Sequence, residues 1–405
     1  MSVKKIVFYL SIFLRSKFIF KNPQKVNFII FDDESIDELK NIIKERKDYF
    51  VLQIRPENFN KLYITFAIFK NLLKNYSKLE KKNIFTAYFI SLIQLTSPKL
   101  VLTNIDNSQK FWEIAKFFNN KIKFVAIQNA VRDYEMDSII VKTDQFKETY
   151  IPHFFCFGNF EVDYYKKKNI AVKNFYPSGS LRLANFFNYL KEEKVNLDTY
   201  QSNICIVSEQ MNEYRKALDD NNFSRDFIKI VKYGIKFCIK NNKKMNFAIK
   251  RNKEKNLSHY NNEINFYKDH LSNEEFNYLI KNSTQKEKKI FSSYLSVYCS
   301  DVTLGVQTSM LREKLAMGGK ILSCNLTKYP IFNFPIKGIC TLNNCNYNEF
   351  EERLNQILMM KNKDYISRLS EKHDYLISYD PNYSVIQHVK DKFLQFDKNL
   401  NNTSN

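Results

Sequence analysis

Strand-length apolar runs alternate with helix-period segments along most of this 405-residue chain, and this alternation restricts the fold more than any other feature. In the first half, the runs with the composition of buried strands are Val26–Phe31, Phe50–Ile54, Leu100–Asn104, Lys123–Gln128 and His153–Phe157. The segments between them with helical periodicity are Ile36–Arg46, Tyr63–Asn75, Phe85–Leu95 and Ser108–Phe118. Strands and helices in this order predict a parallel sheet flanked by helices.

A second unit of the same kind follows a turn-rich segment, Tyr176–Arg182, and a polar stretch, Lys191–Ser202. Its predicted strands are Asn203–Val207, Met245–Ile249, Val297–Cys299, Val302–Gly305 and Lys320–Cys324, and its predicted helices are Arg225–Asn241 and one that begins at Thr308. The polar segment Lys250–Tyr267 is predicted to be an extended loop over a site. We therefore expect an α/β chain of two Rossmann-like domains, 25–190 and 200–380, because 405 residues exceed the usual size of a single core.

The two ends of the chain lie outside these units. In segment 1–24, Lys4 and Lys5 precede a short apolar run that Arg15 and Lys17 interrupt. The run is too short to span a bilayer, and the segment is a poor signal peptide. Two interpretations stay open: an amphipathic helix at an anionic membrane surface, or an ordinary helix packed on the protein. Segment 381–405 is predicted to contain a helix and a polar tail.

Charge and cysteine content restrict the partners. The net charge of +20 suits nucleic acid, an acidic membrane surface or a phosphorylated sugar, although so much Lys and Asn is also typical of AT-rich coding. A Cys/His finger, an aromatic RNP box and an Arg-rich arm are all missing, so nucleic acid is not expected. Seven cysteines without a C-x-x-C pair indicate reduced thiols and a cytoplasmic location. The histidines show no metal-ligand spacing, so neither a metal nor another cofactor is expected.

The segment Ser300–Glu313 has the pattern of an anion-binding turn. Hydroxyl and amide groups of Gln307, Thr308 and Ser309 follow a strand at a helix start, and Glu313 lies one turn beyond Ser309 on the same helix face. A helix N-terminus presents unpaired N–H groups to a phosphate, and a carboxylate one turn further can accept sugar hydroxyls. The segment predicts nucleotide-sugar binding by these four side chains; the alternative is an ordinary helix cap with an exposed glutamate.

The overall pattern resembles a known architecture. The chain has neither G-x-G-x-x-G nor G-x-x-x-x-G-K-[ST], which argues against a dinucleotide dehydrogenase or a P-loop ATPase. Two facing Rossmann-like domains instead fit the GT-B architecture, in which ligands lie between the domains. The order of strand, Ser309, Glu313, Gly319-Lys320 and strand resembles the donor half of bacterial capsule glycosyltransferases, CDP-glycerol glycerophosphotransferases and the 2-epimerase-like group. The resemblance implies that 25–190 is the acceptor domain and 200–380 the donor domain.

A narrower resemblance is carried by four segments together. Thr103–Asn107, Ile127–Arg132, Gly179–Arg182 and Ser300–Asn325 resemble a family of bacterial surface carbohydrate biosynthesis proteins. The resemblance covers roughly Lys25 to Asp380 and depends on the order and spacing of the segments. It implies synthesis of a capsule or lipopolysaccharide.

Polar side chains follow two predicted strands of the first unit. Asp106 and Asn107 come after one strand, and Gln128, Asn129 and Arg132 come after the next. Both groups are expected to face the cleft, where a carboxylate suits a general base and an arginine suits an acidic group of the acceptor. The alternative is that these polar residues only shape turns.

Sequence differences from related enzymes reduce the number of candidate catalytic residues. Capsule Kdo transferases of similar architecture carry an acidic residue where this chain has Asn129 and Ala130, which argues against double displacement through that position. The remaining candidate bases are Asp106, Asp133 and Glu135.

Basic residues at two further positions are assigned to ligands. Lys250 and Arg251 stand where glycerophosphotransferases have K-P-H-P, and without the His and Pro the resemblance implies only cationic contact with the donor. A solvated basic loop is the alternative. Arg182 is assigned first to a hinge and second to acceptor contact.

These observations predict a metal-independent glycosyltransferase that moves a sugar from a nucleotide-sugar donor to a growing cell-surface polysaccharide or glycolipid. The acceptor is expected to be a glycan or a lipid-linked glycan, and the inner-membrane surface is a candidate partner. Two alternatives are a nucleotide-sugar epimerase of the same architecture and a non-catalytic glycan-binding or membrane-associated scaffold.

Overall fold

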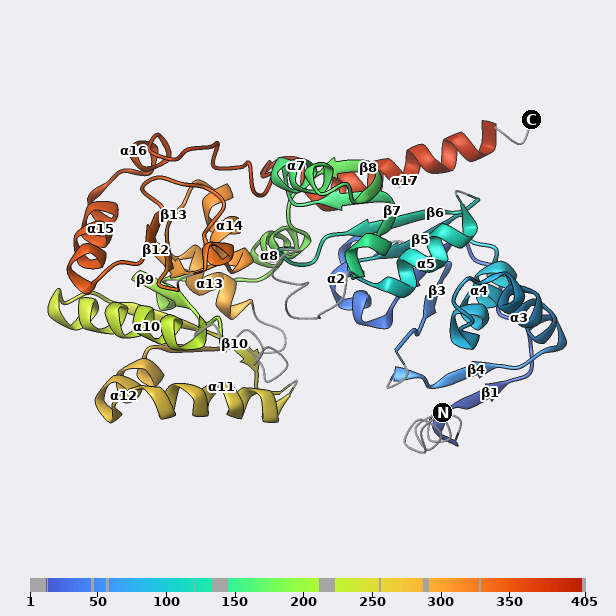
Figure 1. The fold of residues 1–405 in the computed structure, drawn as a ribbon, viewed down its shortest axis with the longest axis horizontal. Helices are drawn as coiled ribbons and strands as arrows, with labels where there is room; N and C mark the ends of the chain where they lie inside the picture. The colour runs from blue at the N-terminus through green and yellow to red at the C-terminus, as the bar shows by residue number, and fades with distance from the viewer. Residues whose placement is uncertain are drawn as a thin grey trace.

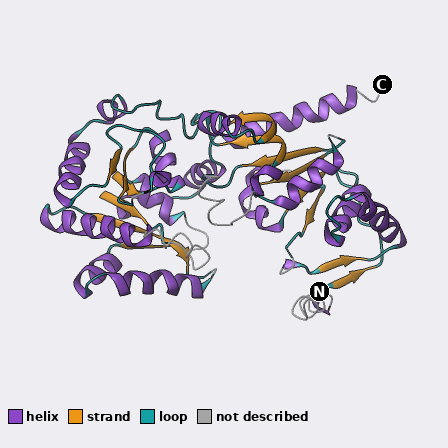
Figure 2. Ribbon diagram, in the orientation of Figure 1, coloured by secondary structure: helices purple, strands orange, loops and turns teal. Residues whose placement is uncertain are grey.

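The computed structural model contains two separate six-stranded sheets, each covered by helices (Figures 1 and 2). It describes residues 12, 14–44, 47–55, 58–119, 121–132, 145–210, 223–254, 256–286, 291–327 and 329–402. Figure 1 shows the two sheets side by side along the longest axis of the molecule, with α7 and α8 between them. The prediction of two Rossmann-like domains is confirmed.

The first sheet comes from the first half of the chain. Its strands are β2 (Phe28–Phe31), β3 (Tyr49–Leu52), β5 (Leu100–Thr103), β6 (Lys123–Ile127), β7 (Tyr150–Cys156) and β8 (Ala171–Pro177). They are all parallel, in the order β3-β2-β5-β6-β7-β8. The buried run of β2 serves both faces: Ile29 and Phe31 join one core, and Phe28 and Ile30 join the other.

Helices cover both faces of this sheet. They are α2 (Ile36–Ile43), α3 (Phe66–Lys78), α4 (Ile84–Thr96), α5 (Gln109–Phe118), α7 (Asn159–Lys167) and α8 (Leu181–Glu192). Several begin at side chains that accept hydrogen bonds from their own first-turn amides: Thr65 before α3, Asn83 before α4, Ser108 before α5 and Ser180 before α8. The local sequence therefore sets where these helices start.

The second sheet has the Rossmann strand order. Its strands are β9 (Ser202–Val207), β10 (Met245–Asn252), β11 (Ser283–Lys286), β12 (Ser300–Gly305), β13 (Lys320–Asn325) and β14 (Thr341–Asn343). They are parallel, in the order β11-β10-β9-β12-β13-β14, which is 3-2-1-4-5-6 in chain order. The direction of the crossovers changes between β9 and β12.

The helices of the second half include one that returns to the first sheet. They are α10 (Phe223–Lys240), α11 (Leu257–His270), α12 (Asn273–Lys281), α13 (Ser292–Tyr298), α14 (Ser309–Ala316), α15 (Tyr347–Met359), α16 (Asn362–Ile366) and α17 (Val385–Asn402). Val389 and Phe393 of α17 are buried in the core that contains Phe28 and Ile30. Figure 1 shows α17, in red, lying beside the first sheet, so the end of the chain connects the two domains.

The N-terminal segment differs from its prediction. Lys17–Ile19 forms strand β1, which pairs in parallel with β4 (Lys61–Tyr63), so the helix expected in segment 1–24 is wrong at these residues. Residues 1–11, with Lys4 and Lys5, lie outside the described part of the chain. Within the described residues, no helix is both long enough and apolar enough to cross a bilayer.

Two predictions for the second half are also wrong. The expected loop Lys250–Tyr267 is largely helix α11, which begins at the cap Asn256 and buries Glu263 and Tyr267 one turn apart. The expected strand Val297–Cys299 belongs to the short helix α13 and the turn after it. A three-residue apolar run is too short to show a strand or helix period. In α13 the buried side chains of Ser293 and Ser296 donate hydrogen bonds to Ile249 of β10 and Thr284 of β11.

Candidate functional site at the carboxyl ends of the two sheets

The carboxyl ends of the two sheets face each other, because residues just beyond them are in contact. Glu161, in the helix after β7, forms an ion pair with Arg312, in the helix after β12. Ser180, just beyond β8, hydrogen-bonds to Glu313, which is also on α14. In sheets of this type, ligands bind beyond the carboxyl ends of the strands where the crossover direction changes. For the second sheet this position is the pair of loops after β9 and β12.

A carboxylate is already bound to backbone amides at this position. Glu209, two residues after β9, accepts hydrogen bonds from the backbone N–H groups of Val306 at 2.5 Å and Gln307 at 3.0 Å. Burial raises the pKa of Glu209, although these amides act in the opposite direction. Gly305 permits the close approach, since a Cβ atom there would lie 2.6 Å from Glu209 Oε1. The loop after β12 therefore presents N–H groups that bind a negatively charged oxygen.

The predicted donor residues Gln307, Thr308 and Ser309 lie in this loop and at the start of α14. Thr308 Oγ1 accepts from the Met310 amide at 3.4 Å, as a helix cap does. Gln307 Nε2 donates to the carbonyl of Ile331 at 2.6 Å, so its side chain holds a neighbouring loop. Ser309 is the half-buried first residue of the helix. The side chains of Gln307 and Thr308 thus make contacts within the protein, and the backbone amides of Val306 and Gln307 are the groups that bind an anionic oxygen.

Lys250, near the carboxyl end of β10, lies beside the same position. Its ammonium group donates to the carbonyl of Gln210 at 3.3 Å and lowers the pKa of Glu209. The backbone amides of Lys250 and Arg251 donate to the buried carboxylate of Glu263 at 3.0 and 2.7 Å. The structure therefore brings Lys250 together with Gln307, Thr308 and Ser309, and α11 fixes the strand end that carries it.

Glu313 faces the first domain. Its Oε1 atom accepts hydrogen bonds from Ser180 at 2.5 Å and Tyr294 at 3.0 Å. Its Oε2 atom is buried and has no hydrogen-bond partner among the residues that the structure describes. Desolvation by burial raises the pKa of Glu313 to about 7. The Glu313 side chain therefore forms a contact between the two domains. Its expected contact with a sugar donor stays a prediction, and these hydrogen bonds do not favour it.

The raised pKa of Glu313 predicts a pH-dependent stability. Between pH 4.5 and about 7 the folded protein keeps a proton that the unfolded chain releases, so stability falls as pH rises through this interval. The shift corresponds to roughly 3 kcal/mol. Glu313→Gln is expected to remove this part of the slope. Urea unfolding of both proteins from pH 4.5 to 8 measures it; equal slopes in the two proteins would contradict the assignment.

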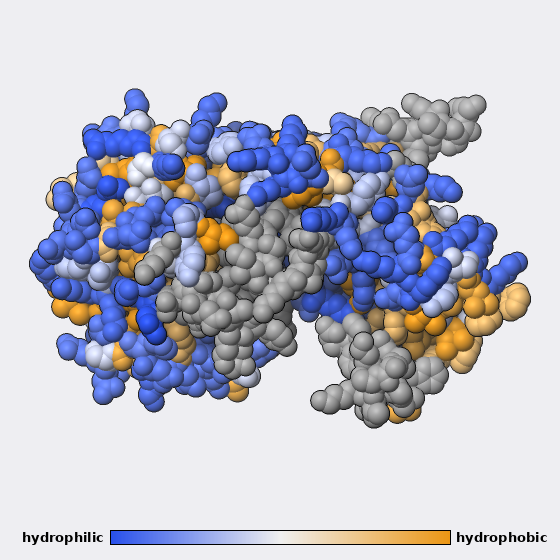
Figure 3. Space-filling view, viewed as in Figure 1, coloured by the Kyte–Doolittle hydropathy of each residue, from blue (hydrophilic) through white to orange (hydrophobic). Residues whose placement is uncertain are grey.

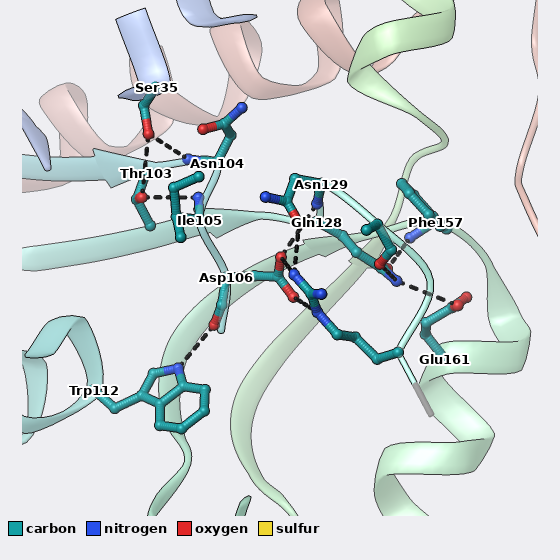
Figure 4. A network of polar contacts seen from close by, with 12 residues as sticks. Ser35, Thr103, Asn104, Ile105, Asp106, Trp112, Gln128, Asn129, Phe157 and Glu161 are labelled. Atoms are coloured by element: carbon teal, nitrogen blue, oxygen red, sulfur yellow. Dashed lines mark hydrogen bonds and ion pairs between the residues drawn. The ribbon is translucent and has the colours of Figure 1, made fainter. Parts of the chain in front are cut away.

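In the first domain, Asp106 and Arg132 form a buried ion pair (Figure 4). Arg132 Nε donates to Asp106 Oδ2 at 2.9 Å, and Arg132 Nη2 donates to Asp106 Oδ1 at 2.6 Å. Asn129 contacts both members of the pair. Its backbone N–H donates to Asp106 Oδ1, and its side-chain Oδ1 atom accepts from Arg132 at 2.5 Å. The structure brings these three predicted residues together. Since Arg132 holds both oxygens of Asp106, the geometry does not favour Asp106 as a free base.

Gln128 belongs to the contact between the domains. Its Oε1 atom accepts from the Phe157 amide at 2.8 Å, and its Nε2 atom donates to Glu161 at 3.4 Å. Arg312 Nη1 lies 3.3 Å from the same oxygen of Glu161, and its guanidinium covers the ring of Phe160. Burial raises the pKa of Glu161 to about 7, although Arg312 acts in the opposite direction. Gln128 thus shapes the contact between α7 and α14.

The remaining predicted residues are dispersed or outside the described chain. Asn107 is exposed at the carboxyl end of the first sheet. Arg182 forms an exposed ion pair with Glu38 at 3.0 Å, at the start of α8. Asp133 and Glu135, the other predicted bases, lie outside the described residues.

Sequence reasoning missed several carboxylates at the strand ends. Asp32 follows β2 directly and is buried. Its Oδ2 and Oδ1 atoms accept hydrogen bonds from Arg55 Nε at 2.8 and 3.0 Å. Its φ of 77° is unusual for a residue with a side chain, and such positions are held by surrounding contacts. Glu209 follows β9 in the same way. The available signal was an acidic residue just after a buried strand, the reasoning used for Asp106.

A cavity of about 440 Å³ lies beside the edge strand of the first sheet. Its lining comes from β3, β4 and α4 and includes Tyr49, Phe59, Tyr63, Tyr88 and Leu92. None of the predicted site residues that the structure describes lines it. Among the described residues, no group of three His, Cys, Asp or Glu side chains is arranged to hold a metal ion.

Two Rossmann-like domains with facing carboxyl ends define the GT-B fold. The sequence matches no protein-family model, and a search of curated proteins found no match. Solved structures share the fold. UDP-N-acetylglucosamine 2-epimerase from Rickettsia bellii is 12% identical, with a TM-score of 0.54 over 93% of this chain and 96% of that one.

Two further solved structures resemble the chain over nearly its whole length. UDP-GlcNAc 2-epimerase from Methanocaldococcus jannaschii, in complex with UDP-GlcNAc and UDP, is 12% identical with a TM-score of 0.50, covering 92% of this chain and 100% of that one. The enzyme from Neisseria meningitidis, bound to UDP-GlcNAc, is 13% identical with a TM-score of 0.50, covering 92% and 99%. At these identities the likeness establishes the fold.

Proposed function

We propose that the chain is a glycosyltransferase that transfers a sugar from a nucleotide-sugar donor to a growing cell-surface polysaccharide or glycolipid. The observation that carries the proposal is the group of backbone amides after β12, which bind the Glu209 carboxylate beside Lys250. Such amides, at the start of a helix and at the crossover switch of a Rossmann sheet, suit a phosphate. The donor domain is 200–380, and the diphosphate binds at α14.

In this proposal the first domain, 25–190, binds the acceptor. Arg132 lies close to the carboxyl end of the first sheet, and Asp106 and Asn129 fix its guanidinium by hydrogen bonds. A fixed guanidinium suits an acidic sugar or a lipid phosphate. Charge on the leaving nucleotide is met by amides and by Lys250, and Asp133 or Glu135 deprotonates the acceptor hydroxyl. The reaction takes place in the cytoplasm, with a lipid-linked acceptor at the inner-membrane surface.

Lys250→Ala is expected to weaken nucleotide binding about tenfold or more, since a charge-assisted hydrogen bond contributes about 1.5–3 kcal/mol. Lys244→Ala is the matched control, because Lys244 is exposed and precedes β10 at the amino end of the same strand. Calorimetric titration with UDP, GDP, CDP and CMP measures both. Equal loss in the two variants, or none in Lys250→Ala, would remove Lys250 from the donor site.

A nucleotide-sugar epimerase is the second candidate. It is favoured by three solved structures with TM-scores of 0.50 to 0.54, each of them a UDP-GlcNAc 2-epimerase. An epimerase converts its nucleotide sugar without an acceptor. Incubation with the donor alone, followed by NMR of the sugar ring protons, separates the two: a new epimer supports the epimerase, and an unchanged donor that reacts only with added acceptor supports the transferase.

A further inference from the structure

One face of helix α3 is exposed and apolar. Phe66, Phe69, Leu73 and Tyr76 recur every three or four residues and are 82%, 59%, 54% and 38% exposed. The opposite face of the helix packs on α4, where Asn75 donates to Ser91 at 3.0 Å. Apolar side chains at this spacing form a continuous stripe along a helix. A stripe of this kind that faces solvent marks an interaction surface.

Neighbouring segments enlarge this stripe. Ile64, just before α3, is 43% exposed, and Phe20, just after β1, is 77% exposed. The two segments are adjacent, because the Ile64 amide donates to the Ile19 carbonyl at 2.9 Å. Figure 3 shows the apolar colour gathered on the lower right of the molecule, in the region of α3, α4 and β4. We call this surface, from Phe20 and Ile64 to Tyr76, the α3 face.

The charged residues of the segments that carry the α3 face are all basic. Segments 14–25 and 58–79 contain no Asp or Glu. Their basic residues are Arg15, Lys17, Lys21, Lys25, Lys61, Lys70, Lys74 and Lys78. Lys70, Lys74 and Lys78 are exposed and succeed one another at four-residue intervals along α3. Apolar side chains bordered by basic residues suit a surface that is apolar beneath an anionic layer.

We infer that the α3 face docks on an anionic lipid bilayer. The apolar side chains enter the boundary between head groups and acyl chains, and the lysines contact lipid phosphates. The 13 residues of α3 span about 20 Å, less than the roughly 30 Å of a hydrocarbon core, so the helix lies on the membrane and does not cross it. A second copy of the chain fits less well, because a two-fold contact would place lysines against lysines.

The inference deepens the proposed function by naming the surface that brings the enzyme to a lipid-linked acceptor. It also moves the predicted membrane contact from a helix in segment 1–24 to α3. Lipid binding needs neither donor nor acceptor, so its failure would leave nucleotide binding untouched. A failure of the proposed reaction would likewise leave lipid binding measurable.

The test is sedimentation of the full chain with vesicles of phosphatidylcholine alone or mixed with phosphatidylglycerol. We expect binding to the mixed vesicles only. Lys70→Glu/Lys74→Glu is expected to lower the partition coefficient at least about tenfold, since each basic residue near an anionic surface contributes about 1 kcal/mol. Phe66→Ser/Phe69→Ser is expected to lower it at least as much.

Controls come from exposed residues of other surfaces. Ile239→Ser/Met359→Ser changes equally exposed apolar residues of the second domain, and Lys166→Glu/Lys167→Glu reverses exposed lysines of α7. Equal melting temperatures confirm that all variants fold. Full binding by the α3 variants, equal loss in the controls, or binding to phosphatidylcholine alone would overturn the inference. So would a dimer of the unmodified chain, measured by light scattering, that Phe66→Ser/Phe69→Ser dissociates, because the α3 face would then join two copies.

Discussion

Replacing Arg312 by methionine is expected to lower the free energy of unfolding by about 3–5 kcal/mol. Arg312 and Glu161 are 4% and 2% exposed, and their ion pair connects α14 to α7. Methionine keeps much of the side-chain volume and leaves the Glu161 carboxylate buried without its cationic partner. Urea unfolding at pH 8, above the pKa of about 7 that Glu161 has beside Arg312, measures the loss.

The matched control is Arg182→Met, which removes an arginine from an exposed ion pair at the same junction. Arg182 is 49% exposed and contacts Glu38 at 3.0 Å, so its loss is expected to cost at most about 1 kcal/mol. Adding Glu161→Gln to Arg312→Met should restore part of the stability, since it removes the uncompensated charge. Similar losses in Arg312→Met and Arg182→Met would contradict a buried connection between the domains.

Gly179→Ala is expected to cost about 2–4 kcal/mol through backbone strain and a steric conflict. Gly179 has φ of +97°, and a Cβ atom there would lie 2.4 Å from the Ser378 carbonyl oxygen. The segment before α17 cannot easily move away, because the Ser378 amide donates to the Phe157 carbonyl at 2.8 Å. The substitution is therefore expected to push the segment around Ser378 away from the turn that follows β8.

Gly318→Ala is the control for backbone strain alone. Gly318 has φ of +76°, and its nearest contact for a Cβ atom is a flexible side-chain end, Ile366 Cδ1, at 3.7 Å. It is expected to cost about 1 kcal/mol. Denaturant unfolding of both variants gives the difference, which is the cost of the steric conflict. If Gly179→Ala cost no more than Gly318→Ala, the returning segment would not be packed as described.

Strands β8, β11 and β14 have short or mixed polar and apolar sequences and were not predicted. The other strands of the two six-stranded sheets could be predicted from sequence because apolar runs identify doubly covered parallel strands, as for β2 and β9. Helices α11 and α13 could not. In α11 the apolar positions are sparse, and the helix depends on the Asn256 cap and on the buried carboxylate of Glu263. In α13 buried serines occupy positions that the pattern treats as polar surface. Both helices are determined by tertiary packing.

The candidate site was predictable to a similar extent. Strand ends indicated Gln307, Thr308 and Lys250, which the structure brings together around Glu209. The spacing of Ser309 and Glu313 gave the right helix but not its environment, because periodicity does not say which neighbouring domain a face meets. Glu209 follows a buried strand as Asp106 does, but its contact with the amides after β12 appears only when the two loops meet in the folded chain.

The most direct test of the central claim is a crystal structure with the nucleotide that binds most tightly among UDP, GDP, CDP and CMP. We predict phosphate oxygens within hydrogen-bond distance of the backbone amides at the start of α14, with the Lys250 ammonium group in contact and Glu209 displaced or protonated. Nucleotide density elsewhere, such as in the cavity lined by Tyr49 and Tyr88, would contradict the proposed donor site. Failure of all four nucleotides to bind would contradict the proposed class of enzyme.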